Sequence, residues 1–149
     1  MKNKLKVVID TNIFMYGWFS ENKTFCTDIM ELVEAQKLHL LFAQDTIGEL
    51  MYISKNFARF HIDEEDERIL LLQNIAELFH HSTSVNTVGT KSVELHDDND
   101  NMFLKCAVKG QADYLISDDF KSGLHDDSVL TDSGIKVVSS EDFIKIFEE

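Results

Sequence analysis

Short runs of aliphatic residues alternate with longer amphipathic segments along this chain. Four of the runs predict buried strands, at residues 6–9, 39–43, 114–117 and 135–138. The segment from Ser82 to Leu95 mixes β-type residues with turn formers and offers at most one more short strand. Strands that alternate with helices form a parallel sheet covered on both faces. We therefore expect a single three-layer α/β/α domain, spanning residues 1–149, with a central parallel sheet of four to five strands.

The amphipathic segments predict the helices between these strands. Asn22 or Thr24 can cap the first helix, a polar break at residues 44–46 supplies the cap of the second, and Ser139 caps the last. The acidic run at residues 63–67 begins a further helix, because acids in a first turn complement the helix dipole. The apolar stripe of this helix is expected on Ile69, Leu72, Ala76 and Phe79. We also expect a short, largely buried helix or turn at 12–19, a helix that ends at Gly110, and a loop at 122–133.

Four acids fall at equivalent places in this predicted sheet. Asp10 follows the first strand, and Glu49 lies early in the helix after the second. Asp100 opens the helix before the third strand, and Asp119 follows the end of that strand. Ligand sites of open α/β sheets lie beyond the carboxyl ends of the strands. We therefore expect the four carboxylates to converge at that edge, and we expect a close approach beside Gly48, since glycine is costly within a helix.

Carboxylates packed this closely repel one another at a low effective dielectric. The arrangement therefore needs a bound cation or raised pKa values. Hard oxygen ligands without His or Cys indicate Mg²⁺ or Mn²⁺. Such ions serve phosphoryl chemistry, where they activate a water and stabilise the leaving oxygen. From the residues alone, the predicted chemistry is metal-assisted hydrolysis of a phosphoester.

The composition adds limits to this prediction. The net charge of −13 argues at first sight against a polyanionic partner, although divalent cations bound to clustered acids would reverse the local field. Cys26 and Cys106 lie in apolar helical stripes, which favours reduced core thiols over a disulfide or a metal site. No apolar run is long enough to span a bilayer, and the N-terminus lacks a signal-peptide pattern, so we expect a cytoplasmic protein without a membrane contact.

The blocks around the four acids resemble the motifs of the PIN-domain family. They are Val8-Ile9-Asp10-Thr11-Asn12, Glu49 in the following helix, residues 97–104 with Ala107, and residues 112–119. In this order and spacing they cover the chain from about residue 5 to the last helix. Within the family, the chain is most similar to VapC-like ribonucleases, the toxin components of bacterial toxin–antitoxin pairs.

The resemblance implies a role for each matched residue. The catalytic acids would be Asp10, Glu49, Asp100 and Asp119, of which Asp10, Asp100 and Asp119 would bind the metal, supported by Asn12, Ser117, Asp97 and Asp118. Two departures are visible, because relatives often have Pro where this chain has Asp98, and Gly or a polar residue where it has Asp118. Either Asp118 or Asp119 could face the metal, and the hydroxyl-x-Asp spacing of the motif favours Asp119.

The activity implied by the resemblance is endonucleolytic cleavage of single-stranded RNA, dependent on Mg²⁺ or Mn²⁺. A metal-activated water would attack phosphorus and leave a 3′-hydroxyl and a 5′-phosphate. The resemblance also implies an antitoxin partner and a homodimer. Basic residues that could contact RNA are Lys55, Arg59, Lys105 and Lys109, although ordinary solvated helix faces explain them equally well. His80 and His81 are adjacent and would point about 100° apart on a helix, so they are not a joint metal site.

Two alternatives remain. An aspartate-clustered phosphohydrolase would need a nucleophilic Asp followed by Asp-Gly-Thr type residues, or a Lys at a later strand end, and neither is evident in the sequence. A non-catalytic PIN-fold module would keep the fold and metal pocket and bind RNA or protein. The four matched acids argue against such a module, whereas the acidic net charge favours it. RNA binding without turnover would distinguish it from an enzyme.

Overall fold

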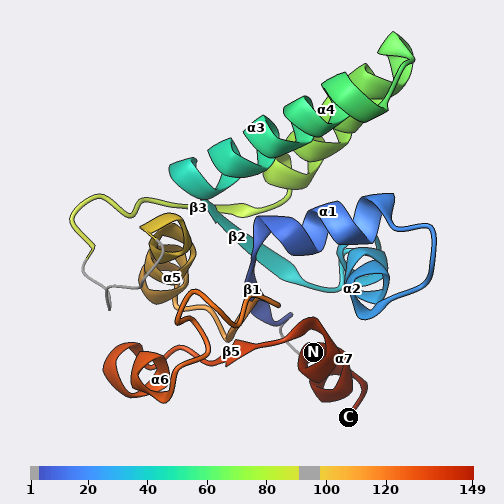
Figure 1. The fold of residues 1–149 in the computed structure, drawn as a ribbon. Coiled ribbons are helices and arrows are strands. Elements are labelled where there is room, and N and C mark those ends of the chain that lie inside the picture. The colour runs from blue at the N-terminus through green and yellow to red at the C-terminus, as the bar shows by residue number, and fades with distance from the viewer. Residues whose placement is uncertain (1–3, 91–97) are drawn as a thin grey trace.

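The computed structural model describes residues 4–90 and 98–149, with the side chains of residues 98–100 excepted. Within this part of the chain, five strands form one sheet in the order β3-β2-β1-β4-β5 (Figure 1). The strands are β1 (Lys6–Ile9), β2 (His39–Ala43), β3 (Thr83–Val85), β4 (Tyr114–Ile116) and β5 (Val137–Val138). Each neighbouring pair is parallel. The predicted parallel sheet is confirmed, including the one short strand expected between residues 82 and 95.

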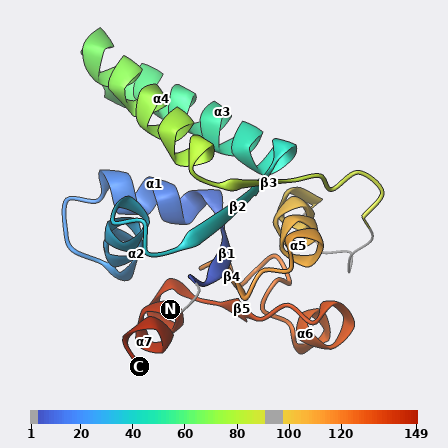
Figure 2. The ribbon, with the colours of Figure 1, turned by 180° about the vertical axis from the view of Figure 1, so that it is seen from behind.

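Helices cover both faces of this sheet, as predicted. They are α1 (Thr11–Phe19), α2 (Phe25–Glu34), α3 (Gln44–His61), α4 (Glu65–His80), α5 (Asp98–Gly110), α6 (Asp127–Ser133) and α7 (Ser140–Glu148). In the two opposite views, α1, α2 and α7 lie on one side of the sheet, and α5 and α6 lie on the other (Figures 1 and 2). Helices α3 and α4 form a hairpin that extends beyond the sheet. No helix in the described part is both long and apolar enough to cross a bilayer.

Side chains along each strand alternate between two hydrophobic cores. In β1, Val7 and Ile9 belong to the core beneath α1, α2 and α7, whereas Val8 belongs to the core beneath α5 and α6. The same alternation separates Leu115 from Ile116 in β4. All five of these side chains are at most 4% exposed. Burial on both faces explains why the strands are continuous aliphatic runs rather than alternating ones.

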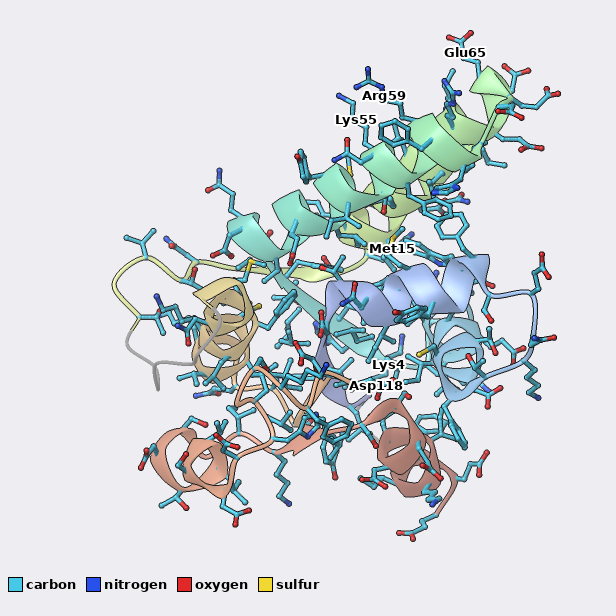
Figure 3. All side chains as sticks on the ribbon, in the orientation of Figure 1. Lys4, Met15, Lys55, Arg59, Glu65 and Asp118 are labelled. Atoms are coloured by element: carbon cyan, nitrogen blue, oxygen red, sulfur yellow. The ribbon has the colours of Figure 1, made fainter. Side chains whose placement is uncertain are left out.

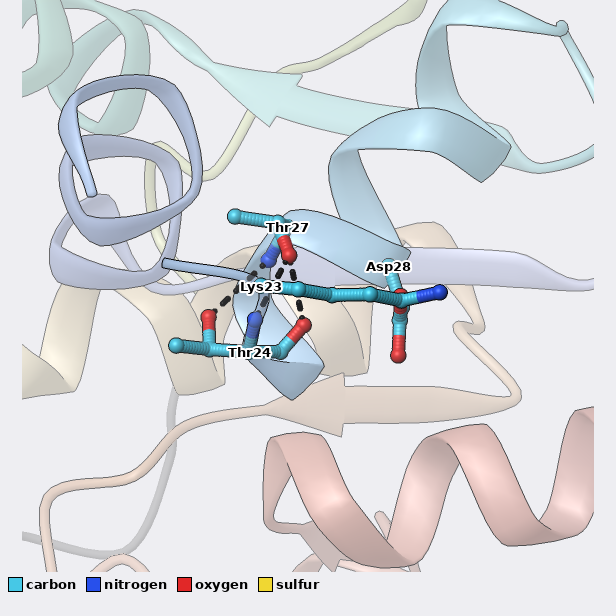
Figure 4. Close-up of polar contacts among 4 residues, drawn as sticks. All are labelled: Lys23, Thr24, Thr27 and Asp28. Atoms are coloured by element: carbon cyan, nitrogen blue, oxygen red, sulfur yellow. Dashed lines mark hydrogen bonds and ion pairs between the residues drawn. The ribbon is translucent and has the colours of Figure 1, made fainter. Parts of the chain in front are cut away.

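The predicted caps of α2 and α7 are confirmed. Thr24 caps α2: its hydroxyl accepts from the N–H of Thr27 at 3.2 Å, and its own N–H donates to Thr27 Oγ1 at 2.8 Å (Figure 4). Beside this cap, the ammonium of Lys23 lies 3.6 Å from an Asp28 carboxylate oxygen. Ser139 caps α7 by accepting from the N–H of Asp142 at 3.1 Å. These local bonds fix the starts of two helices that cover the same face of the sheet.

Two local predictions were wrong, and a third was wrong in part. The polar residues 44–46 do not precede α3 but form its first turn, where Thr46 Oγ1 accepts from the N–H of Ala43 at 2.9 Å. The predicted loop at 122–133 contains α6, which ends at Gly134 with φ 75°. Helix α1 forms as predicted but is only partly buried, since Thr11, Ile13 and Phe14 are buried and Tyr16 is 64% exposed.

The predicted stripe of α4 was wrong in part: of its residues, Phe79 packs against the core as predicted. Ile75 is the buried residue, and Leu71, Leu78 and Phe79 pack around it. Ile69 is 46% exposed instead. Because the α3–α4 hairpin extends beyond the sheet, the first turns of α4 have little besides α3 to cover them (Figure 1). The apolar residues of α4 recur at more than one helical spacing, and contacts with the rest of the fold decide which of them are buried.

Two glycines lie in contrasting surroundings. A Cβ at Gly48 in α3 would meet nothing within 4 Å, so the close approach predicted beside Glu49 is absent. A Cβ at Gly110 would lie 2.7 Å from Leu41 Cδ1 and 3.0 Å from Val85 Cγ2. Helix α5 ends at Gly110 as predicted, and the following residue, Gln111, has a left-handed φ of 55°. Gly110 is therefore required by close packing against the sheet.

These surroundings predict opposite effects of the same substitution. Gly48→Ala should raise the free energy of unfolding by about 0.5–1 kcal/mol, because alanine favours the helix and meets open space. Gly110→Ala should lower it by about 1 kcal/mol or more, because the methyl group overlaps buried Leu41. Urea unfolding of both variants checks this. A Gly48→Ala protein no more stable than the wild type would contradict the assignment.

Candidate active site

Asp10 lies at the carboxyl end of β1 and is 5% exposed. Its backbone N–H donates to Ile116 O at 3.0 Å, which continues the β1–β4 pairing by one residue. Ser117 Oγ donates to Asp10 Oδ2 at 2.9 Å, and the N–H of Asn12 donates to Oδ1 at 3.4 Å. The carboxylate is thus held between the end of the neighbouring strand and the first turn of α1, at the edge of the sheet predicted from the sequence.

Asp119 is attached to the same hydroxyl group. Its backbone N–H donates to Ser117 Oγ at 3.1 Å, so Ser117 accepts from Asp119 while it donates to Asp10. The N–H of Lys121 donates to Asp119 Oδ1 at 2.9 Å, which fixes the carboxylate in a tight turn. Ser117 itself is fully buried. One buried hydroxyl therefore sets the position of two acids.

Asp118 faces a different part of the molecule. Its Oδ1 accepts from the N–H of Ser140 and its Oδ2 from the hydroxyl of Ser140, both at 2.7 Å. Cys26 Sγ in α2 lies 3.6 Å from Oδ2. Figure 3 labels Asp118 between the sheet and α7. Its carboxylate holds the loop after β4 onto the start of α7, a role that neighbouring residues in the sequence do not indicate.

The pKa of the Asp10 carboxyl is raised above its ordinary value. Burial is the main cause, and the nearby charges of Asp119 and Asp118 raise the pKa further. The hydrogen bonds from Ser117 and from the Asn12 backbone oppose this shift but do not cancel it. In the described part of the chain, no Lys, Arg or His lies within 4.0 Å of a carboxylate oxygen of Asp10 or Asp119. The site therefore concentrates negative charge without a basic partner there.

Glu49 lies in the first turns of α3, as predicted. Thr11 follows Asp10 at the start of α1, and its Oγ1 donates to Glu49 Oε2 at 3.2 Å. Thr11 is 2% exposed, and Glu49 is half-buried. The structure thus links Thr11, the residue after Asp10, to Glu49.

Asp100 lies in the first turn of α5, but its side chain falls outside the described residues. Asp97 falls outside them entirely. Among the described side chains, no group of three His, Cys, Asp or Glu is placed to hold a metal ion. The predicted metal-binding set depends on Asp100. The donors that are described, the carboxylates of Asp10 and Asp119 beside the Ser117 hydroxyl, are all oxygen and fit a hard divalent cation in kind.

The predicted basic residues lie on helices. Lys55 and Arg59 are exposed, and they project from the outer side of α3 (Figure 3). On α5, Lys109 is exposed and Lys105 is half-buried. Asn12 is also exposed, with its backbone rather than its side chain bonded to Asp10. The rings of His80 and His81 meet edge to face, and His81 lies 4.0 Å from Glu77.

Two cysteines are buried and free. Burial, together with the charge of Asp118, raises the pKa of the Cys26 thiol to about 11. Burial likewise raises the pKa of Cys106 to about 12, with a contribution from Asp45. Both groups are therefore protonated thiols at neutral pH, in keeping with the predicted core role.

Sequence reasoning missed His125, Phe120 and Ser140. His125 Nε2 lies 2.7 Å from the carbonyl oxygen of Ser117, and its ring stacks on Phe120. Ser140 donates two hydrogen bonds to the carboxylate of Asp118, as described above. An aromatic residue directly after a predicted site acid was a signal for Phe120. The other two are brought in by the packing of α6 and α7, for which the local sequence gives no sign.

The raised pKa of Asp10 predicts how pH affects stability. Protonated Asp10 favours the folded state, so this stabilisation is full below the ordinary aspartate pKa and is lost as pH rises through the raised folded pKa. Asp10→Asn should therefore raise the metal-free melting temperature at neutral pH, and the difference from wild type should shrink in acid. Thermal melts across this pH range check it. A variant less stable than wild type at neutral pH would contradict it.

The chain matches known proteins over most of its length. Among solved structures, a chain of VapBC2 from Rickettsia felis, bound to a DNA fragment from their promoter, is similar with a TM-score of 0.53 at 10% identity. The match covers 91% of this chain and 98% of that one, and it shows the shared fold. A search among curated proteins gives no match. The family profile of the PIN domain matches residues 6–121, so this chain belongs to the PIN-domain family.

Proposed function

We propose that this protein is a Mg²⁺- or Mn²⁺-dependent endoribonuclease that cleaves single-stranded RNA, and that it is the toxin of a toxin–antitoxin pair. PIN domains are generally nucleases, which supports hydrolysis of nucleic acid. The observation that carries the proposal is the buried Asp10 carboxylate, joined to Asp119 through the hydroxyl of Ser117. A buried acid with a raised pKa beside other acids is typical of a functional site.

Each acid has a proposed role. Asp10, Asp100 and Asp119 would hold the cation, and Glu49 would act with them in catalysis. When bound, the cation would supply the positive charge that eases deprotonation of a water and offsets the charge of the phosphate. Ser117 orients Asp10 and Asp119, and Thr11 orients Glu49. Asp118, whose carboxylate is occupied by Ser140, is left out of the metal-binding set.

The reaction is an in-line hydrolysis of the phosphodiester. A bond forms between the water oxygen and phosphorus, and the bond between phosphorus and O3′ breaks. The products are a 3′-hydroxyl and a 5′-phosphate. The chain contributes by holding its carboxylates in fixed positions before the substrate arrives, which lowers the entropy cost of reaching the transition state. Ser117, buried and bonded on both sides, is the residue that provides this order.

RNA would have to approach a protein of net charge −13. We propose that Lys55 and Arg59 on α3, with Lys105 and Lys109 on α5, contact its phosphates. Both helices begin at the carboxyl edge of the sheet, near Asp10, and could guide the RNA backbone along them. Phosphate contacts of this kind supply affinity independently of sequence.

A protein partner is part of the proposal. One structural neighbour is a chain of VapBC2, and this likeness supports an antitoxin partner for this chain. Large exposed aromatic side chains support an interface as well: Tyr16, Tyr52 and Phe60 are 64%, 68% and 75% exposed. Aromatic side chains are enriched at protein interfaces. We propose that an antitoxin, and a second copy of this chain in a homodimer, cover such surface.

The proposed activity is tested by cleavage of a mixed pool of single-stranded RNA with Mn²⁺ or Mg²⁺. Asp10→Asn should abolish cleavage, and Ser117→Ala should slow it about 10–100-fold, because the hydroxyl positions both acids. EDTA should abolish cleavage by the wild type. Asp63→Asn, a matched change at an exposed acid before α4, should leave the rate unchanged.

Two results would count against this function. Equal cleavage by wild type and Asp10→Asn would place the activity elsewhere or in a contaminant. RNA binding by the wild type without cleavage, in the presence of demonstrated metal binding, would instead favour a non-catalytic binding module. The products check the chemistry, since at each cut the proposed reaction leaves a 3′-hydroxyl on the upstream fragment and a 5′-phosphate on the downstream fragment.

A further inference from the structure

Phe120 is an exposed aromatic residue directly after Asp119. Its side chain is 66% exposed, although it is a large apolar group. Its ring stacks on the ring of His125, with centroids 4.1 Å apart and planes inclined by 23°. The near-parallel arrangement means that His125 backs one face of the phenyl ring. Much of the remaining ring surface is open to solvent beside the candidate active site.

The support for this ring is connected to the acids. His125 Nε2 lies 2.7 Å from the carbonyl oxygen of Ser117, the residue whose hydroxyl contacts Asp10. The loop before His125 is anchored as well, since Leu124 is fully buried and its N–H donates to Ser122 Oγ at 3.3 Å. Ring, histidine and acids therefore belong to one ordered unit.

We propose that Phe120, backed by His125, is a stacking platform for a nucleobase of the single-stranded RNA whose cleaved phosphate lies at Asp10 and Asp119. This inference rests on the proposed function. An ordered ring loses little conformational freedom when a base stacks on it, so more of the stacking energy appears as affinity. Stacking on an aromatic ring also tolerates any base, as proteins that bind single strands require.

The position of Phe120 favours a base over other occupants. An RNA strand with a phosphate at Asp119 must place a neighbouring nucleotide close by, and Phe120 is the adjacent residue in the chain. Lys121, which follows it, is exposed and carries a positive charge for the strand's backbone. Leu70 gives a comparison, since it is another large apolar side chain that is 55% exposed, but it lies in α4 on the hairpin that extends beyond the sheet.

Binding of a short single-stranded RNA of mixed sequence tests the platform. The RNA carries a fluorescent adenine analogue at one position at a time, and Ca²⁺ replaces Mg²⁺ to slow turnover. Stacking should quench the fluorescence at one position with the wild type and with Phe120→Trp. Phe120→Ala should lose that quenching and bind about 5- to 150-fold more weakly. Leu70→Ala should behave as the wild type does.

The outcomes separate this proposal from the nuclease function. Unchanged quenching and affinity in Phe120→Ala would overturn the platform, even if the wild type cleaves RNA in Mg²⁺. Quenching that depends on Phe120 without any cleavage would support the platform while the proposed nuclease function fails. If Phe120→Ala weakens only the binding of a co-expressed partner protein, the ring belongs to a protein interface and the proposal is overturned. Because Phe120 is exposed, we expect its variants to fold, and their thermal melts provide the control.

Discussion

The hydrogen bond between Ser117 Oγ and Asp10 Oδ2 is the interaction on which the geometry of the site depends. It joins the ends of two neighbouring parallel strands, whose register pairs Ile9 with Ile116 immediately before the bonded residues. Both partners are buried, so water does not compete easily for the bond. The same hydroxyl accepts from the backbone of Asp119. A change in the pairing of β1 and β4 would therefore move both acids at once.

This arrangement is unfavourable by itself, and the rest of the fold stabilises it. Asp10 is buried in a chain of net charge −13, close to Asp118 and Asp119. The opposing energy comes from two hydrophobic cores that enclose both faces of the sheet. Asp118 adds to the repulsion, yet its bonds to Ser140 fix the loop that carries Ser117 and Asp119. Acids whose pKa is raised in this way are commonly found at functional sites.

The sequence allowed the sheet and two of its site acids to be predicted because they depend on local patterns. A buried strand in a parallel sheet is an uninterrupted aliphatic run, so the ends of β1 and β4, and with them Asp10 and Asp119, could be located directly. The parallel sheet with both faces covered follows from the alternation of strands and helices along the chain. Neither inference needs side-chain coordinates.

Other features depend on contacts between distant segments, and these could not be predicted. Asp118 and Asp119 are adjacent in sequence, and only the position of Ser140 shows that the first faces α7. Helix α6 was missed because its seven residues carry little apolar pattern of their own. The support of Phe120 by His125 arises where the chain folds back before α6. The apolar stripe of α4 was wrong in part for the same reason, because contacts with distant segments, and not the local pattern, make Ile75 its buried residue.

We propose that Asp10 is a buried acid whose charge is unfavourable until a cation binds. Carbon-13 NMR of the side-chain carboxyl, titrated against pH with and without Mg²⁺, measures this directly. We expect a pKa above the ordinary aspartate range in the metal-free protein and a fall in that pKa when Mg²⁺ is added. An ordinary or lowered pKa in the metal-free protein, or a pKa that Mg²⁺ does not change, would contradict it.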